Sequence, residues 1–500
     1  MKFPRKFILE ITVFVSGALV MVYEIIGSRI LAPYIGTSTY TWTSLIGVIL
    51  AALSLGYWLG GKTADRKPQI GVLAAVLFFA GGLVAVTIVV KEPVLILLGA
   101  STFPIELKAV AAAVLLFAPA SVLMGFVTPY AVKLKTRELE KTGETVGKLY
   151  ALSTIGSIVG TFAAGFLLIP FVGSTRSLYI IATSLLALSV LLAPFSVSRK
   201  NIAIIVVFVL GIVVNESLAL YLRSSNGFYD FDTRYNRVQI FETNHRENNR
   251  PIRAMRIDPS YFQSSMYLDS DELTSEYAKF YHLIRVLKPN FTHTLMIGGA
   301  GYSFPKDYLN KYPQATMDVV EIDPGMTEIA HRFFRLNENS RLKIFHEDGR
   351  VFLNSAPSEK YDAVFIDAFT SMFSVPFQLT TTEAIQEIKR VLKPGGVVIA
   401  NIGGAIEGRH SRFLWAEFAT YNRIFSSVSL FAVSPETSKN VPQNIILVAG
   451  VYDLPVMLNQ AETLCKEIED GNSCKVINPD KRNSQQVLVD DLAPVESLNR

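Results

Sequence analysis

Cysteine and net charge are both scarce in this chain. Its 500 residues include two cysteines, Cys465 and Cys474, and carry a formal net charge of +4 at pH 7. So small a charge on so long a chain is weak evidence for nucleic-acid binding, and we predict no nucleic-acid partner. We also predict no metal site. The cysteine pattern leaves open whether the two pair as a disulfide outside the cytoplasm or remain free thiols.

Long apolar runs are absent after Arg223 and dominate the chain before it. Hydrophobic residues make up 50% of the sequence, and the mean hydropathy of +0.33 is high for a soluble protein. Most of the apolar stretches are long enough to cross about 30 Å of hydrocarbon at roughly 1.5 Å per residue. The sequence therefore predicts a lipid-embedded domain of about seven transmembrane helices, near residues 7–28, 42–61, 71–90, 109–130, 149–172, 178–195 and 202–221.

Two details of these stretches refine the prediction. The first apolar run continues through Leu31 without a small-residue cleavage site, so we expect a retained helix rather than a cleaved signal peptide. Gly156 and Gly160 form a small-xxx-small pattern, which favours close packing of one membrane helix against another.

The chain after the apolar stretches has the pattern of an α/β domain. Residues 235–242 and 252–258 alternate apolar with polar side chains, as half-buried strands do. Six further strands are predicted at 294–298, 317–321, 342–346, 361–367, 396–401 and 444–450, with helices near 325–335, 380–392 and 411–422 between most of them. This alternation predicts a largely parallel, Rossmann-like sheet that binds ligands at the carboxyl ends of its strands.

Five hundred residues exceed what one hydrophobic core usually supports, so we predict several domains. The proposed divisions are a transmembrane helical domain at 1–222, a small β entry region at 223–290, and a Rossmann-like domain at 291–500.

Candidate ligand-binding residues follow the predicted strands in order. The turn Gly298-Gly299-Ala300-Gly301 comes directly after the first strand of the α/β domain, where small residues let backbone N–H groups approach a ligand. Glu321 lies twenty residues beyond Gly301, the spacing of a carboxylate that binds ribose hydroxyls. Asp348, followed by Gly349, comes after the third strand, where it can accept a hydrogen bond from an adenine amino group. Each acidic residue taken alone also fits a helix cap or a turn.

The region from about Tyr235 to Gly450 resembles the spermidine synthase family of aminopropyltransferases, relatives of the class I methyltransferases. The motifs that carry this resemblance are Tyr235-Asn236-Arg237-Val238, Ile257-Asp258 with Gln263-Ser264, the segment from Asp271-Glu272 to Tyr281-His282, the glycine turn, Val320-Glu321-Ile322-Asp323-Pro324, Glu347-Asp348-Gly349, Tyr361 to Asp367, and Leu392-Lys393-Pro394-Gly395-Gly396. The whole chain is similar to the membrane-fused branch of the family, in which Tyr23-Glu24 and Leu59-Gly60-Gly61 are further marks.

The resemblance implies a reaction and a set of site residues. The donor would be decarboxylated S-adenosylmethionine, and the acceptor would be a small amine such as putrescine. Donor-binding residues would be Gln263, Gly298, Gly299, Gly301, Glu321, Asp323, Asp348 and Gly349. Asp367 would be the catalytic base, with Tyr235 and Tyr261 as helpers, although a carboxylate that only orients its loop is the alternative.

Two positions depart from the family pattern. Gly301 stands where the soluble enzymes have an aspartate for the donor's free amino group, and Thr370 stands where a second aspartate serves the attacking amine. Three hypotheses therefore remain: an aminopropyltransferase with an unusual acceptor, a transferase of methyl or another alkyl group from intact S-adenosylmethionine, and a non-catalytic sensor or transporter that binds an adenosyl ligand or polyamine. A homo-oligomer is possible in each.

The predicted location is the cell membrane, but two arguments disagree about the side of the C-terminal domain. With the N-terminus inside, the short cytoplasmic loops hold thirteen lysines and arginines, whereas the opposite loops hold only Lys91, Lys108 and Arg176. Seven spans would then place the C-terminal domain outside the cytoplasm. An adenosyl sulfonium donor, however, is expected inside it.

Overall fold

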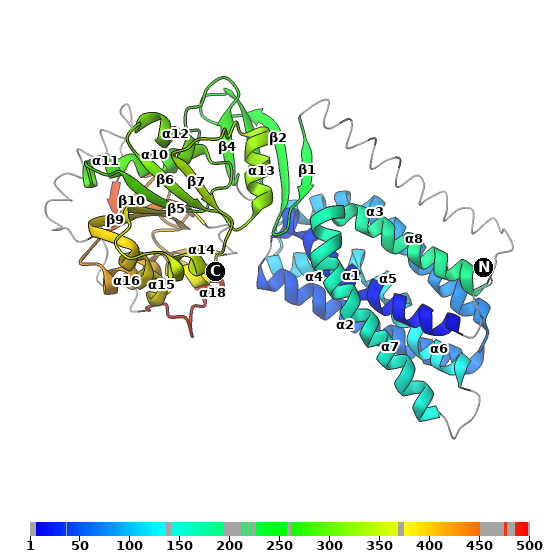
Figure 1. Cartoon of the computed structure of the whole chain (residues 1–500). Coiled ribbons are helices and arrows are strands. Elements are labelled where there is room, and N and C mark those ends of the chain that lie inside the picture. The colour runs from blue at the N-terminus through cyan, green and yellow to red at the C-terminus, as the bar shows by residue number, and fades with distance from the viewer. Residues whose placement is uncertain are drawn as a thin grey trace. The chain divides into compact units, whose positions relative to one another are not determined.

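The structure, a computed structural model, describes residues 7–36, 38–136, 142–193, 213, 217, 221, 227–257, 262–368, 375–450, 475–477 and 486–498. Contacts within the chain divide it into two compact units, Met1–Gln239 and Ile240–Arg500, and each is described by itself (Figure 1).

The first unit is built from long apolar helices. They are α1 (Ile8–Ile35), α2 (Thr39–Arg66), α3 (Ile70–Ala100), α4 (Ile105–Leu116), α5 (Ala118–Gly125), α6 (Val127–Lys135), α7 (Thr142–Ala163), which continues as the π-helix η3 (Ala164–Val172), and α8 (Ser174–Leu192). Among the described residues, five helices could cross a membrane by length and composition, or six if the segment Ile105–Lys135, bent by 53°, is one span. The predicted count of about seven is not confirmed, and the seventh stretch, 202–221, lies largely outside the described residues.

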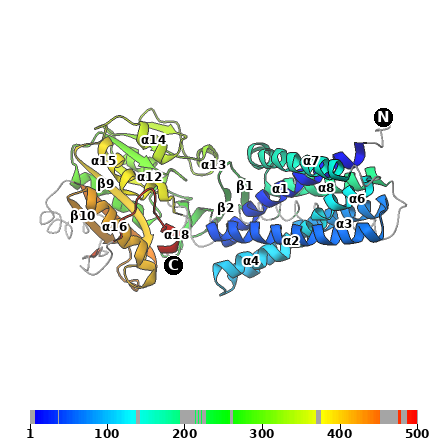
Figure 2. The ribbon, with the colours of Figure 1, turned by 90° about the horizontal axis from the view of Figure 1, so that it is seen from below.

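Small residues let α7 lie directly against α1, and Figure 2 shows the two helices side by side. A Cβ atom added at Gly156 would come within 2.0 Å of the backbone oxygen of Phe14, and one added at Gly160 within 2.2 Å of the oxygen of Ala18. Only glycine fits at these two positions, so the predicted packing role of the small-xxx-small pattern is confirmed.

A four-stranded sheet follows the helices in the chain. Its strands have the order β1 (Tyr229–Asp232), β2 (Arg237–Asn244), β3 (Pro251–Arg256) and β4 (Ser264–Tyr267). Strands were predicted at 235–242 and 252–258, which match β2 and β3, whereas β1 and β4 were not foreseen. The boundary between the two units falls inside β2.

The second unit has an eight-stranded sheet in the order β12-β10-β11-β9-β8-β5-β6-β7. The strands are β5 (His293–Ile297), β6 (Thr316–Val320), β7 (Leu342–Phe345), β8 (Tyr361–Ile366), β9 (Leu392–Gly404), β10 (Ser427–Ala432), β11 (Gln443–Gly450) and β12 (Lys475–Ile477). From β9 to β7 all neighbours are parallel, whereas β11, β10 and β12 pair antiparallel. The predicted Rossmann-like sheet is therefore confirmed, with an antiparallel edge that was not predicted.

Helices cover both faces of this sheet, as Figure 1 shows. On one side are α14 (Gly349–Ser355), α15 (Thr382–Val391) and α16 (Arg412–Ile424), whose buried Phe352, Ile385 and Leu414 share a core with β5, β8 and β9. On the other side lies α12 (Ser303–Lys311). The helix α13 (Pro324–Phe333) connects β6 to β7.

The strand order reverses between β5 and β8, and this reversal positions the site. From β5 the chain proceeds outward through β6 to β7, whereas from β8 it proceeds the other way to β9. In open α/β sheets, ligands bind at the carboxyl ends of the strands where the order reverses. The residues after Ile297 and Ile366 are therefore the first candidates for a binding site.

Candidate active site

The glycine turn begins where β5 ends, and its backbone requires small residues. Gly298 has a φ of +98°, and a Cβ there would lie 2.2 Å from the backbone oxygen of Asp367. At Gly301 a Cβ would lie 2.4 Å from the Oγ atom of Ser264. The place that an aspartate side chain would start from is thus occupied by Ser264, which accounts for glycine at this position.

Glu321 follows β6, and its carboxylate holds the glycine turn in place. Its Oε2 accepts hydrogen bonds from the backbone N–H groups of Gly299 and Ala300 at 2.9 and 3.0 Å, and its Oε1 accepts one from Asp323 at 3.0 Å. Burial raises the pKa of Glu321, while these three N–H groups act in the opposite direction. The residue predicted to bind ribose therefore also builds the turn beside it.

Two predicted donor-binding aspartates cap helices. Asp323 is fully buried and accepts a hydrogen bond from the N–H of Gly325 at the start of α13. Asp348 accepts bonds from the N–H groups of Arg350 and Val351 at the start of α14, at 2.8 and 3.2 Å. The capping role considered for these residues is therefore present.

Asp367 directly follows β8, and its hydrogen-bond partners in the described part of the chain are neutral. Its Oδ2 accepts a hydrogen bond from the hydroxyl of Tyr277 at 3.1 Å, and its Oδ1 accepts one from the Nδ2 of Asn401 at 3.2 Å. Burial raises the pKa of Asp367, although the nearby polar groups of Asn401, Tyr277 and Tyr281 lower it in part. A half-buried carboxylate with neutral partners and a raised pKa is a candidate proton acceptor.

A pocket lies between the glycine turn, Asp367 and the segment that precedes and includes the short helix α10 (Glu276–Lys279). Its enclosed volume is about 30 Å³, and it is lined by Gln263, Ser264, Leu273, Thr274, Ser275, Tyr277, Ala278, Met296, Gly299, Ala300, Ser303, Phe304, Pro305 and Asp367. Hydroxyl, amide and apolar side chains predominate. Asp367 is the one carboxylate in this lining, which consists of described residues only.

The predicted site residues fall into three groups. Gln263, Gly299 and Asp367 line it, and the other donor-binding candidates lie at the ends of β5, β6 and β7. Tyr235 belongs to the first unit and is 49% exposed, so its catalytic role stays a prediction. Tyr261, like Thr370, Cys465 and Cys474, lies outside the described residues.

Sequence reasoning missed the two hydrogen-bond donors to Asp367. Asn401 lies in β9, next to β8, and a polar residue within an apolar parallel strand is a signal that could have been used. Tyr277 lies four residues before Tyr281 in a segment that the family resemblance had already marked. Its contact with Asp367 spans 90 residues and has no local signal.

Comparisons with known proteins find similar sequences in this part of the chain. Residues 275–433 match the sequence profile of the family described as Spermine/spermidine synthase domain. The polyamine aminopropyltransferase of Vibrio vulnificus (strain CMCP6) is 29% identical over 225 residues, which cover 43% of this chain and 72% of that protein. The crystal structure of a probable spermidine synthase from Corynebacterium glutamicum ATCC 13032 matches 50% of this chain and 89% of its own, with 21% identity and a TM-score of 0.43.

A longer alignment reaches beyond the α/β domain. Polyamine aminopropyltransferase 2 of Aquifex aeolicus (strain VF5) is 23% identical over 411 residues, which cover 79% of this chain and 79% of that protein. The second unit is only about half of the chain, so this similarity extends into the helical unit. The C-terminal part of the chain carries a spermine/spermidine synthase domain, and its homologues, the polyamine aminopropyltransferases, are transferases.

Proposed function

We propose that this protein is a membrane-bound aminopropyltransferase that uses decarboxylated S-adenosylmethionine as its donor and a small amine as its acceptor. The observation that carries the proposal is Asp367, a carboxylate with neutral partners beside the glycine turn of a spermine/spermidine synthase domain. Its position at the point where the strand order reverses supports a role at the reacting atoms.

The reaction requires the protein mainly to align the two substrates and to accept a proton. The lone pair of a neutral amine attacks the aminopropyl carbon bound to the sulfonium, a new C–N bond forms, and the C–S bond breaks. Its electron pair stays on sulfur, which leaves neutral methylthioadenosine. Asp367 takes the proton that the new secondary ammonium loses, and its raised pKa makes it a stronger base than an exposed aspartate.

The donor's adenosine is proposed to lie across the ends of β5, β6 and β7. Glu321 holds the glycine turn and has lone pairs left for a ribose hydroxyl. Asp348 uses its Oδ1 as a helix cap, which leaves Oδ2, 3.4 Å from the Nε2 of Gln378, to accept a bond from the adenine amino group. Gly349 lies so close to Ile297 that a Cβ would be 2.7 Å away, so a larger residue would disturb this surface.

Transfer of a methyl or another alkyl group from intact S-adenosylmethionine is a second candidate. It is favoured by Gly301, because the side chain of Ser264 occupies the space where a carboxylate for the donor's amino group would start. The two donors leave different products. Methylthioadenosine identifies aminopropyl transfer, whereas S-adenosylhomocysteine identifies methyl transfer.

One assay tests these functions together. Detergent-solubilised full-length protein is incubated with each donor and a panel of amines, and the products are identified by mass spectrometry. We expect methylthioadenosine to form only with the decarboxylated donor and an amine. Donor binding without product from any amine would instead indicate the sensor or transporter hypothesis.

The helical unit is proposed to span the cell membrane several times. Five to six helices of sufficient length and apolarity support this, and the alignment with the Aquifex aeolicus protein covers part of the same unit. The side of the α/β domain follows from a reporter tag at Arg500 that is tested for accessibility on each side. A cytoplasmic tag would agree with the supply of donor, and an external tag would agree with the count of positive charges.

A further inference from the structure

The pocket beside Asp367 has an unusual charge balance for a site that would hold a diamine. Among its fourteen lining residues, all of them described, Asp367 is the one charged side chain. Gln263, Ser264, Thr274, Ser275 and Ser303 supply neutral polar groups, and Leu273, Met296 and Phe304 supply apolar surface. The pocket thus offers one full negative charge, at one place.

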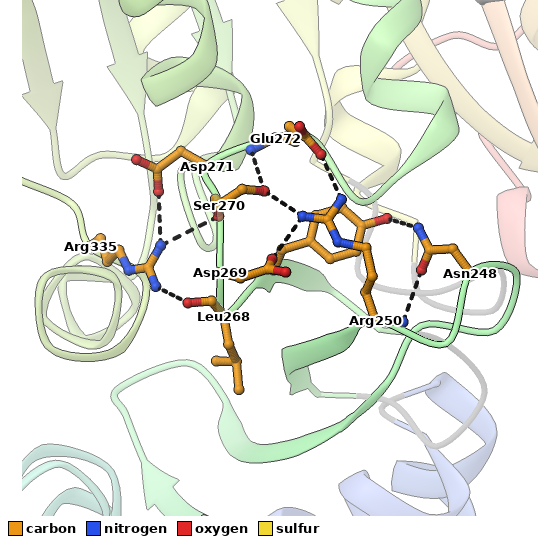
Figure 3. A network of polar contacts seen from close by, with 9 residues as sticks. Asn248, Arg250, Leu268, Asp269, Ser270, Asp271, Glu272 and Arg335 are labelled. Atoms are coloured by element: carbon orange, nitrogen blue, oxygen red, sulfur yellow. Dashed lines mark hydrogen bonds and ion pairs between the residues drawn. The ribbon is translucent and has the colours of Figure 1, made fainter.

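The acidic residues nearest in sequence to the pocket wall are already paired with arginines, as Figure 3 shows. Arg250 binds Asp269 at 2.8 Å and Glu272 at 2.7 Å, and Arg335 binds Asp271 at 3.2 Å. These contacts direct the carboxylates of residues 269–272 toward the arginines. They leave little negative charge for a second cation in the pocket.

Other acidic residues near the pocket also form ion pairs or hydrogen bonds within the chain. Glu276, next to Ser275, pairs with Lys279 at 2.7 Å, and Asp307 on α12 pairs with His282 at 2.6 Å. Glu321 accepts three backbone N–H groups. In addition, the sequence after Asp367 contains no aspartate or glutamate before Glu383.

We infer that the acceptor is a primary monoamine whose far end is uncharged, rather than a diamine. The inference rests on the proposed transferase function. The amino group of the acceptor would be held by Asp367, its methylene chain would pass over Met296 and Phe304, and its far end would meet hydroxyl side chains. A second ammonium would lose its water without gaining a partner of opposite charge, which is costly in a partly buried site.

The first experiment compares acceptors of equal length. Full-length protein and decarboxylated S-adenosylmethionine are supplied with 4-aminobutan-1-ol, butylamine or putrescine, and kcat/KM is measured from methylthioadenosine release. We expect 4-aminobutan-1-ol to exceed putrescine by about tenfold or more, because a charge without a partner is rejected more strongly than a small difference in size. Equal or better use of putrescine overturns the inference but leaves the proposed function intact. Methylthioadenosine release with no amine at all overturns both.

A matched pair of variants tests the charge argument within the pocket. Ser275 lines the pocket and precedes α10 as its N-cap residue, a position that accepts both aspartate and asparagine. Ser275→Asp adds a carboxylate, whereas Ser275→Asn adds a neutral group of the same shape. We expect the aspartate variant to raise the ratio of putrescine to 4-aminobutan-1-ol use by about tenfold relative to the asparagine variant. An unchanged ratio between the two variants would count against the inference.

Discussion

A buried ion cluster in the first unit and Asp367 in the second unit hold charge in opposite ways. In the first unit, Glu92 on α3 lies 2.5 Å from Lys91 and 3.4 Å from Arg237, and Arg237 also lies 2.7 Å from Asp230. Lys91 and Arg237 are 1% and 4% exposed, and Tyr34 donates a further hydrogen bond to Glu92. In the second unit, Asp367 receives bonds from an amide and a phenol.

This difference separates a structural site from a reactive one. Each carboxylate of the first cluster already interacts with a cation. Taking up a proton or binding an amine would therefore give it no additional stabilising interaction. Asp367 has neutral hydrogen-bond partners among the described residues, and it lines a pocket. It can therefore gain a cation or a proton from a substrate.

The largest expected effect comes from removing the reactive carboxylate. Asp367→Asn should lower kcat by about 10²- to 10⁴-fold, the usual contribution of a general base, with donor affinity retained. Burial raises the pKa of this aspartate, so its ionised form costs stability as the pH rises through that pKa. The variant should consequently be no less stable than the natural protein at pH 7.

Rates of methylthioadenosine release and donor binding measured by calorimetry check this prediction. The same raised pKa places the acid limb of the kcat/KM profile above the pH range in which an exposed aspartate titrates. Near-normal turnover in Asp367→Asn would show that the carboxylate only orients its loop.

The next effect concerns the paired cluster of the first unit. Arg237→Met should destabilise the protein by about 3 kcal/mol, because it leaves Asp230 without its buried cationic partner and removes one of the two cations beside Glu92. The control is Lys133→Met, which breaks an exposed ion pair with Asp65 that is expected to contribute less than about 1 kcal/mol. Thermal unfolding of the full-length protein in detergent measures both. Equal losses of stability in the two variants would mean that the buried ion pairs contribute no more than the exposed one.

Glu417 tests whether a buried carboxylate without a counter-charge must be reactive, because it lies outside the pocket lining. Glu417 on α16 is 2% exposed, and its Oε1 has no hydrogen-bond partner among the described residues. Burial raises the pKa of Glu417 well above its ordinary value, so the stability of the natural protein should fall as the pH rises through that pKa.

Replacing Glu417 by leucine should stabilise α16 by about 1–3 kcal/mol and remove this pH dependence, without changing turnover. Hydrogen exchange of the α16 amides at pH 6 and pH 8 measures the effect. Glu417→Gln is the control, since it removes the ionisation but keeps a polar group. Loss of activity in Glu417→Leu would mean that a buried carboxylate without a counter-charge contributes to turnover even when it lies outside the pocket.

The smallest effect comes from a residue that acts through Asp367. The bond from Asn401 lowers the pKa of Asp367, so Asn401→Ala should raise that pKa further and move the acid limb of the kcat/KM profile to higher pH. We expect kcat/KM at neutral pH to fall by about fivefold, the value of one hydrogen bond. A uniform fall without movement of the acid limb would indicate a merely structural role.

Sequence patterns predicted most of the α/β fold and placed the candidate site residues at the ends of its strands. The strands that became β5, β6, β7 and β8 are short apolar runs bounded by polar turns, and such runs are recognisable without any contact information. The antiparallel strands β10 and β12 were not predicted, nor were the short helices α12 and α14. Short elements contain too few residues for periodicity to distinguish them from loops.

The sequence by itself determined that an apolar helical half precedes an α/β half, and that Gly298, Glu321, Asp348 and Asp367 stand at the ends of neighbouring strands. Local hydrophobic period is sufficient for this, because it depends on residues that are close together in the chain. Only the tertiary structure decided which groups each carboxylate contacts. Tyr277 reaches Asp367 across 90 residues, and Arg250 reaches the acidic loop across about twenty. Contacts over such distances depend on how the elements pack, and packing decides which carboxylate remains free to react.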